Sequence, residues 1–266
     1  MDAFLVTPAW LKERISDPRV RVVDARKPMD YAAGHIPGAV NIPAGEFIEM
    51  RGRVATLPPK ERVEQMLGSR SIANDSLVVA YDDRFGTLAG RFLYTLAYFG
   101  HRDLAILNRN FDQYALQGNP VETGVPAVAP AQYRASSPAP IRATKEEVLA
   151  RSGNGGSRLV DTRAPNEYMM GHIPNSVNVP WMAGAARDRI FRPPEELKKL
   201  FAERGLKPDD EVICYCNMGM TSSHTYWALR LAGFTKVKMY PESMGEWMMD
   251  GKLPVARASF GGEHGR

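Results

Sequence analysis

The chain repeats itself along its length. Residues 24–43 read DARKPMDYAAGHIPGAVNIP, and residues 161–180 read DTRAPNEYMMGHIPNSVNVP. The offset between the copies is constant at 137 (161 − 24 and 180 − 43), and eleven of the twenty positions are identical. Such self-similarity indicates a duplicated structural unit. The 266-residue chain therefore predicts two copies of one domain of about 120 residues.

Each copy alternates short apolar runs with helical patterns. The expected strands of the first copy are 20–25, 39–43, 76–81 and 104–108, and those of the second are 158–162, 176–180, 211–215 and 236–240. Helical patterns between strands indicate crossover connections and parallel pairing. We expect an α/β fold in which each domain is a parallel sheet flanked by helices. A ligand site then belongs at the carboxyl ends of the strands.

A segment rich in Pro, Ala and Ser, PAVAPAQYRASSPAP, lies between the two copies at residues 126–140. This composition is typical of a linker. We therefore divide the chain into a first domain at 1–125, the linker, and a second domain at 141–266.

Composition narrows the class of partner. The formal charge of +4 comes from scattered Lys and Arg, without a basic block, which argues against nucleic acid and favours a small anion. The sequence has neither a bilayer-length apolar run nor a signal-type leader, so we expect a cytoplasmic protein without membrane contact. Two cysteines fit a reducing compartment, and a lone C-x-C lacks the further ligands of a zinc site. We expect no metal and no cofactor.

The duplication separates scaffold from chemistry, because a feature found in both copies is explained by the shared fold. His35 and His172 lie in the GHIP turn of each copy, so we interpret them as structural side chains that bond the loop backbone. The D-x-R motif is also duplicated, at 24–26 and 161–163. Its Asp is expected to accept loop amides, and Arg163 is either structural or a clamp for an anionic substrate.

Cys216 breaks the symmetry. Its counterpart in the first copy is Asp82, in a loop of the same length, DDRFGT against CNMGMT. Cys214 lies opposite Ala80 inside an apolar run, and we interpret it as a buried small hydrophobe. The shared fold therefore does not explain why a cysteine stands at position 216, which indicates a chemical role for its thiol.

The loop after Cys216 supplies that reason. A strand, a short turn containing Gly219 and a helix starting near Thr221 direct several backbone N–H groups into one concavity, and the helix dipole adds positive charge. A thiolate is favoured there, with a pKa below the usual value of about 8.5. A nucleophile activated in this way needs no adjacent general base.

With these residues the chain resembles the tandem-domain rhodaneses, the thiosulfate and 3-mercaptopyruvate sulfurtransferases. The resemblance rests on the duplicated D-x-R and GHIP units, the one-sided cysteine loop and the closing YPESMGEW and DGKLPV, and it spans about residues 7–255. It implies a catalytically silent first domain with Asp82 at the cysteine position. It also implies Cys216 as the catalytic residue, followed by a loop that holds the transferred sulfur: Asn217, Met218, Gly219, Met220 and Thr221.

The resemblance implies a sulfurtransferase. A sulfane sulfur would move from a small anionic donor such as thiosulfate or 3-mercaptopyruvate, through a Cys216 persulfide, to cyanide or a thiol. Three alternatives stay open. One is a persulfide carrier or binding module without independent turnover. The second is a cysteine phosphatase, although Ser222 stands where a C-x5-R loop needs arginine, and the third is a cysteine hydrolase using His224.

Overall fold

A computed structural model describes residues 4–154 and 158–257 of the chain. Three stretches of the predicted domains lie outside the described residues: 1–3, 155–157 and 258–266. The chain forms two compact units: a first unit, Met1–Arg142 with Ala185–Pro193, and a second unit, Ala143–Gly184 with Pro194–Arg266. Each unit is described below by itself.

A parallel sheet forms the centre of the first unit. Its strands are β1 (Leu5–Val6), β2 (Val20–Asp24), β3 (Val40–Asn41), β6 (Leu77–Tyr81) and β7 (Leu104–Leu107). They pair in the order β1-β7-β6-β2-β3, and every pair is parallel. The four strands predicted for the first copy are therefore confirmed. Strand β1 was not predicted and extends the sheet beside β7, with Leu5 opposite Ile106.

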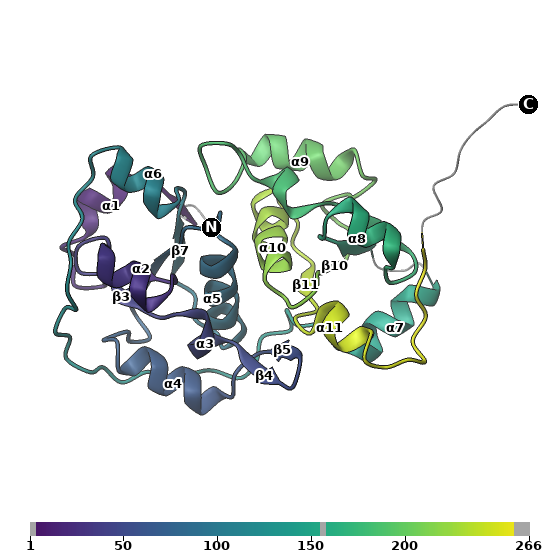
Figure 1. The fold of residues 1–266 in the computed structure, drawn as a ribbon, viewed down its shortest axis with the longest axis horizontal. Helices are drawn as coiled ribbons and strands as arrows, with labels where there is room; N and C mark the ends of the chain where they lie inside the picture. Colours follow the sequence, from purple (N-terminus) through teal and green to yellow (C-terminus); the bar gives the residue numbers. More distant parts are fainter. Residues whose placement is uncertain (1–3, 155–157, 258–266) are drawn as a thin grey trace, which may run out of the picture. The chain divides into compact units, whose positions relative to one another are not determined.

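Helices cover both faces of this sheet (Figure 1). The helices are α1 (Pro8–Arg14), α2 (Pro28–Ala33), α3 (Ala44–Phe47), α4 (Lys60–Gly68), α5 (Thr87–Tyr98) and α6 (Phe111–Leu116), and a hairpin of β4 (Glu49–Arg51) and β5 (Val54–Thr56) adds to them. Leu11 of α1 and Phe111 of α6 share one apolar cluster with Val22 and Val79 of the sheet. Helix α5 is buried along most of its length and packs on β6 and β7.

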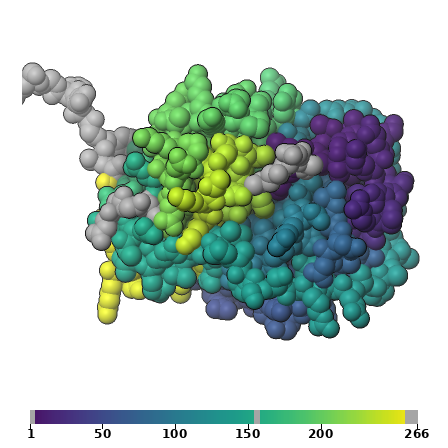
Figure 2. Space-filling model, turned by 180° about the vertical axis from the view of Figure 1, so that it is seen from behind, coloured from purple at the N-terminus to yellow at the C-terminus, as the bar shows by residue number. Residues whose placement is uncertain are grey.

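The second unit repeats this plan on a parallel sheet in the order β11-β10-β8-β9. Its elements are α7 (Lys145–Asn154), β8 (Arg158–Asp161), α8 (Pro165–Met170), β9 (Ser176–Asn178), the 3-10 helix η1 (Trp181–Gly184), α9 (Pro194–Ala202), β10 (Val212–Tyr215), α10 (Thr221–Leu231), β11 (Val237–Met239) and α11 (Ser243–Trp247). Helices α7 and α11 share a core cluster with β8 and β10. Helix α10 packs on β10, β11 and α9, and the surfaces of α9 and of the segment after β10 adjoin in Figure 2.

Two connecting segments pack closely on the first unit. In the predicted linker, the Ala131 N–H donates to the Gly68 carbonyl at 2.9 Å and Tyr133 is buried. Ile190 and Phe191 are buried as well, and the Phe191 N–H donates to Asn108 Oδ1 at 3.1 Å. Residues 185–193, placed by sequence in the second domain, thus belong to the first unit by packing, while the predicted boundary at residue 140 stays a prediction.

Within residues 4–154 and 158–257, no helix combines the length and the hydrophobicity that a bilayer crossing requires.

The packing of Ile190 predicts a difference between two glycines of the first unit. Gly86 (φ +73°) and Gly118 (φ +74°) share a left-handed backbone, but a Cβ on Gly86 would overlap the Ile190 side chain, whereas one on Gly118 would meet nothing within 4 Å. We expect Gly118→Ala to cost about 1 kcal/mol of unfolding free energy from backbone strain. Gly86→Ala should cost about 1–3 kcal/mol more from overpacking. Urea denaturation measures both, and equal costs would contradict the packing of Ile190.

Candidate active site

Cys216 lies directly after the central strand β10, at the carboxyl end of the sheet. The start of α11 fixes the backbone at this point. The Cys216 N–H donates to Ser243 Oγ at 3.1 Å, and the Cys216 carbonyl accepts from the Met244 N–H at 3.0 Å. The Asn217 carbonyl accepts from the Gly245 N–H at 2.9 Å. The nucleophile candidate and the first loop residue are therefore held by a second element besides their own strand.

The loop surrounds the Cys216 sulfur with donors. The Gly219 N–H points at Sγ from 3.1 Å, and the positive φ of Gly219, +74°, turns the backbone toward the sulfur. Burial raises the pKa of Cys216, but the hydroxyls of Thr221 and Ser222 and the amides of Ser222 and Met218 outweigh it, so the pKa is lowered. The side chain is 3% exposed. The donors predicted around the sulfur (the cradle) are thus present, and the side chain that carries it is buried.

Cys214 has the opposite environment two residues earlier in the same strand. It is fully buried, and its Sγ lies 3.4 Å from the Ser222 carbonyl and 3.5 Å from the Lys238 carbonyl. Carbonyl oxygens accept a hydrogen bond from the S–H group of a thiol, but they repel the negative charge of a thiolate. Burial, and then the neighbouring Cys216, raise the pKa of Cys214. The prediction that Cys214 is a buried side chain is confirmed.

In the first unit the corresponding cradle is filled by Asp82. Its Oδ1 accepts from the N–H groups of Arg84 (2.9 Å) and Gly86 (2.8 Å), and its Oδ2 accepts from those of Leu88 (2.8 Å) and Ala89 (2.9 Å). Adding the loop offset of 134 to 84 and 88 gives 218 and 222, two of the amides that act on Cys216. In the first unit the buried Asp82 side chain therefore fills the position that, in the second unit, corresponds to the Cys216 loop.

The remaining predicted loop residues differ in what their side chains do. The Asn217 Nδ2 donates to Glu167 Oε1 at 2.7 Å, outside the cradle. Met218 is 45% exposed, so its amide faces the sulfur while its side chain faces solvent. Met220 caps α10 with its backbone, and Thr221 is its first residue. The structure thus brings the backbone of the predicted loop around Cys216, and Thr221 alone of its side chains acts on the sulfur.

Arg163 is engaged by the scaffold. Its Nε lies 3.0 and 3.1 Å from the two carboxylate oxygens of Asp161, and its Nη2 donates to Asp161 Oδ2 and, at 2.7 Å, to the Gly171 carbonyl. Arg26 makes the same set of bonds with Asp24 and Gly34 in the unit that lacks the thiol. The contacts favour the structural interpretation. Binding of a substrate by Arg163 stays a prediction.

The GHIP histidines are structural, as predicted. His35 Nδ1 lies 2.9 Å from the Tyr31 carbonyl and His172 Nδ1 lies 2.8 Å from the Tyr168 carbonyl. Each ring also stacks on that tyrosine, with centroids 3.9 and 3.7 Å apart. Tyr31 of α2 and Tyr168 of α8 are thereby held against the GHIP turn that follows each helix.

The residues invoked for the rival chemistries lie inside the fold. Ser222 and His224 are both 0% exposed within α10. The imidazole of His224 meets the edge of the Trp181 ring, with centroids 5.4 Å apart. Position 222, where a phosphatase loop requires arginine, thus holds a small buried side chain.

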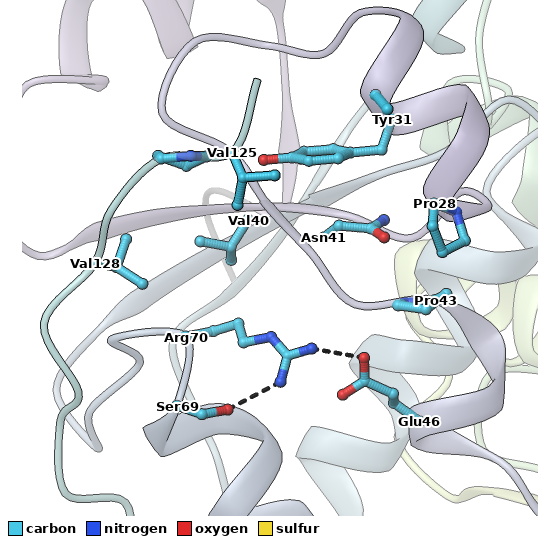
Figure 3. A pocket seen from close by; sticks show the side chains of 12 residues that line it. Pro28, Tyr31, Val40, Asn41, Pro43, Glu46, Ser69, Arg70, Val125 and Val128 are labelled. Atoms are coloured by element: carbon cyan, nitrogen blue, oxygen red, sulfur yellow. Dashed lines mark hydrogen bonds and ion pairs between the residues drawn. The ribbon is translucent and has the colours of Figure 1, made fainter. Parts of the chain in front are cut away.

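A cavity lies on the first unit, away from the residues of the Cys216 loop (Figure 3). It measures about 420 Å³ and is lined by Tyr31, Val40 and Val125 among other residues. At its floor Arg70 donates to Glu46 at 2.6 Å and to Ser69 Oγ at 2.9 Å. Its charged groups are thus paired with each other, and it contains no thiol, so it does not compete with Cys216 as a centre of covalent chemistry.

Sequence reasoning missed two residues at the site. Ser243, the first residue of α11, is fully buried with φ +54° and accepts from the Cys216 amide, and neither property can be read from the YPESMGEW stretch in which it lies. Glu167 contacts Asn217 across fifty residues of sequence. Ala164 at the N-cap lacks a side-chain acceptor, so the sequence carries no capping-box signal for Glu167, and its contact with the loop was not visible either.

The fold and site define a class of protein: a duplicated α/β domain that carries one activated thiol in an amide-lined loop. The family model described as "Rhodanese-like domain" matches residues 7–117 and 144–250. The chain belongs to the rhodanese-like domain family.

Similar proteins align over nearly the whole chain. The sulfur carrier protein TtuD of Thermus thermophilus is 30% identical, with 95% of this chain and 96% of TtuD covered. The thiosulfate sulfurtransferase of Azotobacter vinelandii is also 30% identical, with 94% and 96% covered. The crystal structure of SseA from Escherichia coli, described as a 3-mercaptopyruvate sulfotransferase, superposes with a TM-score of 0.83 at 25% identity, covering 91% of this chain and 98% of SseA.

The lowered pKa of Cys216 predicts its alkylation profile. The thiolate is the reacting form, so a lowered pKa shifts the midpoint of the rate against pH below the value of about 8.5 of an ordinary cysteine. Iodoacetamide labelling followed by peptide mass spectrometry measures this midpoint. Cys214 serves as the internal control and should react only after unfolding. A Cys216 midpoint at or above 8.5 would contradict the activation.

The bond from the Cys216 amide predicts the effect of replacing Ser243. Ser243→Ala leaves a buried N–H without its acceptor and should lower the unfolding free energy by about 1–3 kcal/mol. Ser243→Gly loses the same bond but relieves the positive φ, so it should be about 1 kcal/mol more stable than the alanine variant. Both should raise the alkylation midpoint of Cys216. An unchanged midpoint in both variants would mean that Ser243 does not position the nucleophile.

Proposed function

We propose that this chain transfers a sulfane sulfur from a small donor to a thiophilic acceptor through a persulfide on Cys216. Its enzyme class, sulfurtransferase, follows from the family and from relatives of nearly full length that are named for this activity. The proposal adds the covalent intermediate, the nucleophile and the loop of residues 217–221 that holds the transferred sulfur.

The observation that carries the proposal is the set of donors around the Cys216 sulfur. Nucleophilic sulfur chemistry needs a thiolate, and the lowered pKa of Cys216 favours that form over the thiol. The product of the first step is again an anion, one sulfur further out. Backbone amides such as that of Gly219 would stabilise that charge in the manner of an oxyanion hole.

With thiosulfate, the Cys216 thiolate attacks the outer sulfur. A new S–S bond forms on the enzyme, the S–S bond of thiosulfate breaks, and its electron pair leaves with sulfite. With 3-mercaptopyruvate, the C–S bond breaks instead, the thiol proton ends on carbon, and pyruvate leaves. Cyanide or a thiolate then attacks the outer persulfide sulfur, which releases thiocyanate or a new persulfide and restores the Cys216 thiolate.

A persulfide carrier is the second candidate, because one relative of 30% identity is named a sulfur carrier protein. A carrier would form the same persulfide on Cys216 but would deliver the sulfur only to a partner protein. Multiple turnover with small molecules alone therefore separates the two functions.

The proposal predicts a covalent adduct on one cysteine. Incubation with thiosulfate or 3-mercaptopyruvate should add the mass of one sulfur atom to the protein, and cyanide should remove it. Cys216→Ser should abolish the adduct, while Cys214→Ser, which changes the fully buried thiol, should retain it. Intact-protein mass spectrometry measures the adduct, and thiocyanate formation measures turnover.

Each outcome decides between the candidates. Adduct and thiocyanate over many cycles support the enzyme, and an adduct without repeated turnover supports the carrier. If neither donor modifies the wild-type protein, or if Cys216→Ser is modified equally, the proposed mechanism is wrong.

A further inference from the structure

Glu167 places a carboxylate on the loop that follows Cys216. Its Oε1 accepts from Asn217 Nδ2 at 2.7 Å, and its Oε2 accepts from the Ala164 N–H, at the start of α8, at 3.2 Å. Helix α8 follows β8, the loop follows β10, and these strands are neighbours in the sheet. Two hydrogen bonds to two separate segments therefore fix this negative charge beside the residue next to the nucleophile.

The loop itself offers no cationic side chain against this charge. Residues 216–221 read CNMGMT. Arg163, the cation that follows β8, spends its Nε and Nη2 on Asp161 and on the Gly171 carbonyl. An incoming sulfur donor therefore meets backbone amides at the sulfur and a carboxylate beside the loop. The Arg163 bonds described above lead to Asp161 and Gly171, and none of them leads to the loop.

We propose that Glu167 is a specificity-determining residue that selects sulfur donors by charge. A fixed carboxylate repels an approaching anion in proportion to the charge on that anion. A dianion such as thiosulfate is penalised about twice as strongly as a monoanion at the same position. The substrate class that the site favours is a sulfane or thiol sulfur donor with at most one negative charge, such as 3-mercaptopyruvate. This inference rests on the proposed sulfur transfer and concerns the same site.

Glutamine at position 167 separates charge from geometry. Glu167 occupies the third position of α8, where Glu and Gln serve equally in a capping box. The glutamine carbonyl can accept from the Ala164 N–H while its Nε2 donates to Asn217 Oδ1 once the Asn217 amide turns over, so Glu167→Gln removes the charge and keeps a hydrogen bond to each segment. A purely positioning role through Asn217 would change both donors alike, whereas a charge role changes their ratio.

The experiment compares kcat and KM for thiosulfate and for 3-mercaptopyruvate in the wild type, Glu167→Gln and Glu195→Gln. Glu195 is an exposed carboxylate on α9, so its variant removes the same charge away from the loop. We expect Glu167→Gln to raise kcat/KM for thiosulfate about three- to tenfold, mainly through KM, and that for 3-mercaptopyruvate about one- to threefold. Glu195→Gln should match the wild type with both donors.

Salt supplies a second readout. Screening over a Debye length of about 8 Å at physiological ionic strength should weaken the repulsion, so potassium chloride should raise thiosulfate kcat/KM in the wild type more than in Glu167→Gln. An unchanged donor ratio in Glu167→Gln, or the same salt response in both proteins, would overturn the selection by charge while sulfur transfer itself continued. Absence of transfer from both donors in the wild type would instead remove the proposed function, and this inference with it.

Discussion

The site depends on one constraint: the junction between a central strand and the following helix leaves a ring of backbone N–H groups that needs a negative partner. The two units meet this need in different ways. Asp82 fills the ring in the first unit with a carboxylate that accepts four amides. Cys216 is shorter and fills its ring with a single sulfur. In the proposed persulfide, the transferred sulfur would be a second atom within this ring of donors.

The duplicated contacts show which residues the fold itself demands. Asp24 and Asp161 each hold an arginine that reaches back to a glycine carbonyl, with nearly the same distances in both units. A first unit without the thiol keeps this network intact, so the network maintains the carboxyl ends of the strands rather than the chemistry. It also explains why Arg163 has little freedom to act on a substrate.

Local patterns predicted the strands and the loop whose amides face Cys216, because these depend on alternation, glycine placement and comparison between copies. Long-range contacts were not predictable in the same way. The burial of Ile190 in the first unit, the bond from Cys216 to Ser243 and the contact of Glu167 with Asn217 each join segments that no local pattern connects. The positive φ of Ser243 follows from those contacts and has no signature in the sequence. Tertiary packing decided all four.

The two cysteines show that burial alone does not decide the direction in which the pKa of a thiol shifts. Cys214 and Cys216 belong to the same strand and its end, both are at most 3% exposed, and burial is the largest influence on the pKa of each. Their pKa values nevertheless shift in opposite directions. Carbonyl oxygens face the sulfur of Cys214, whereas amides and hydroxyls face that of Cys216. The opposite pKa shifts of the two thiols therefore follow the direction of the dipoles that face each sulfur.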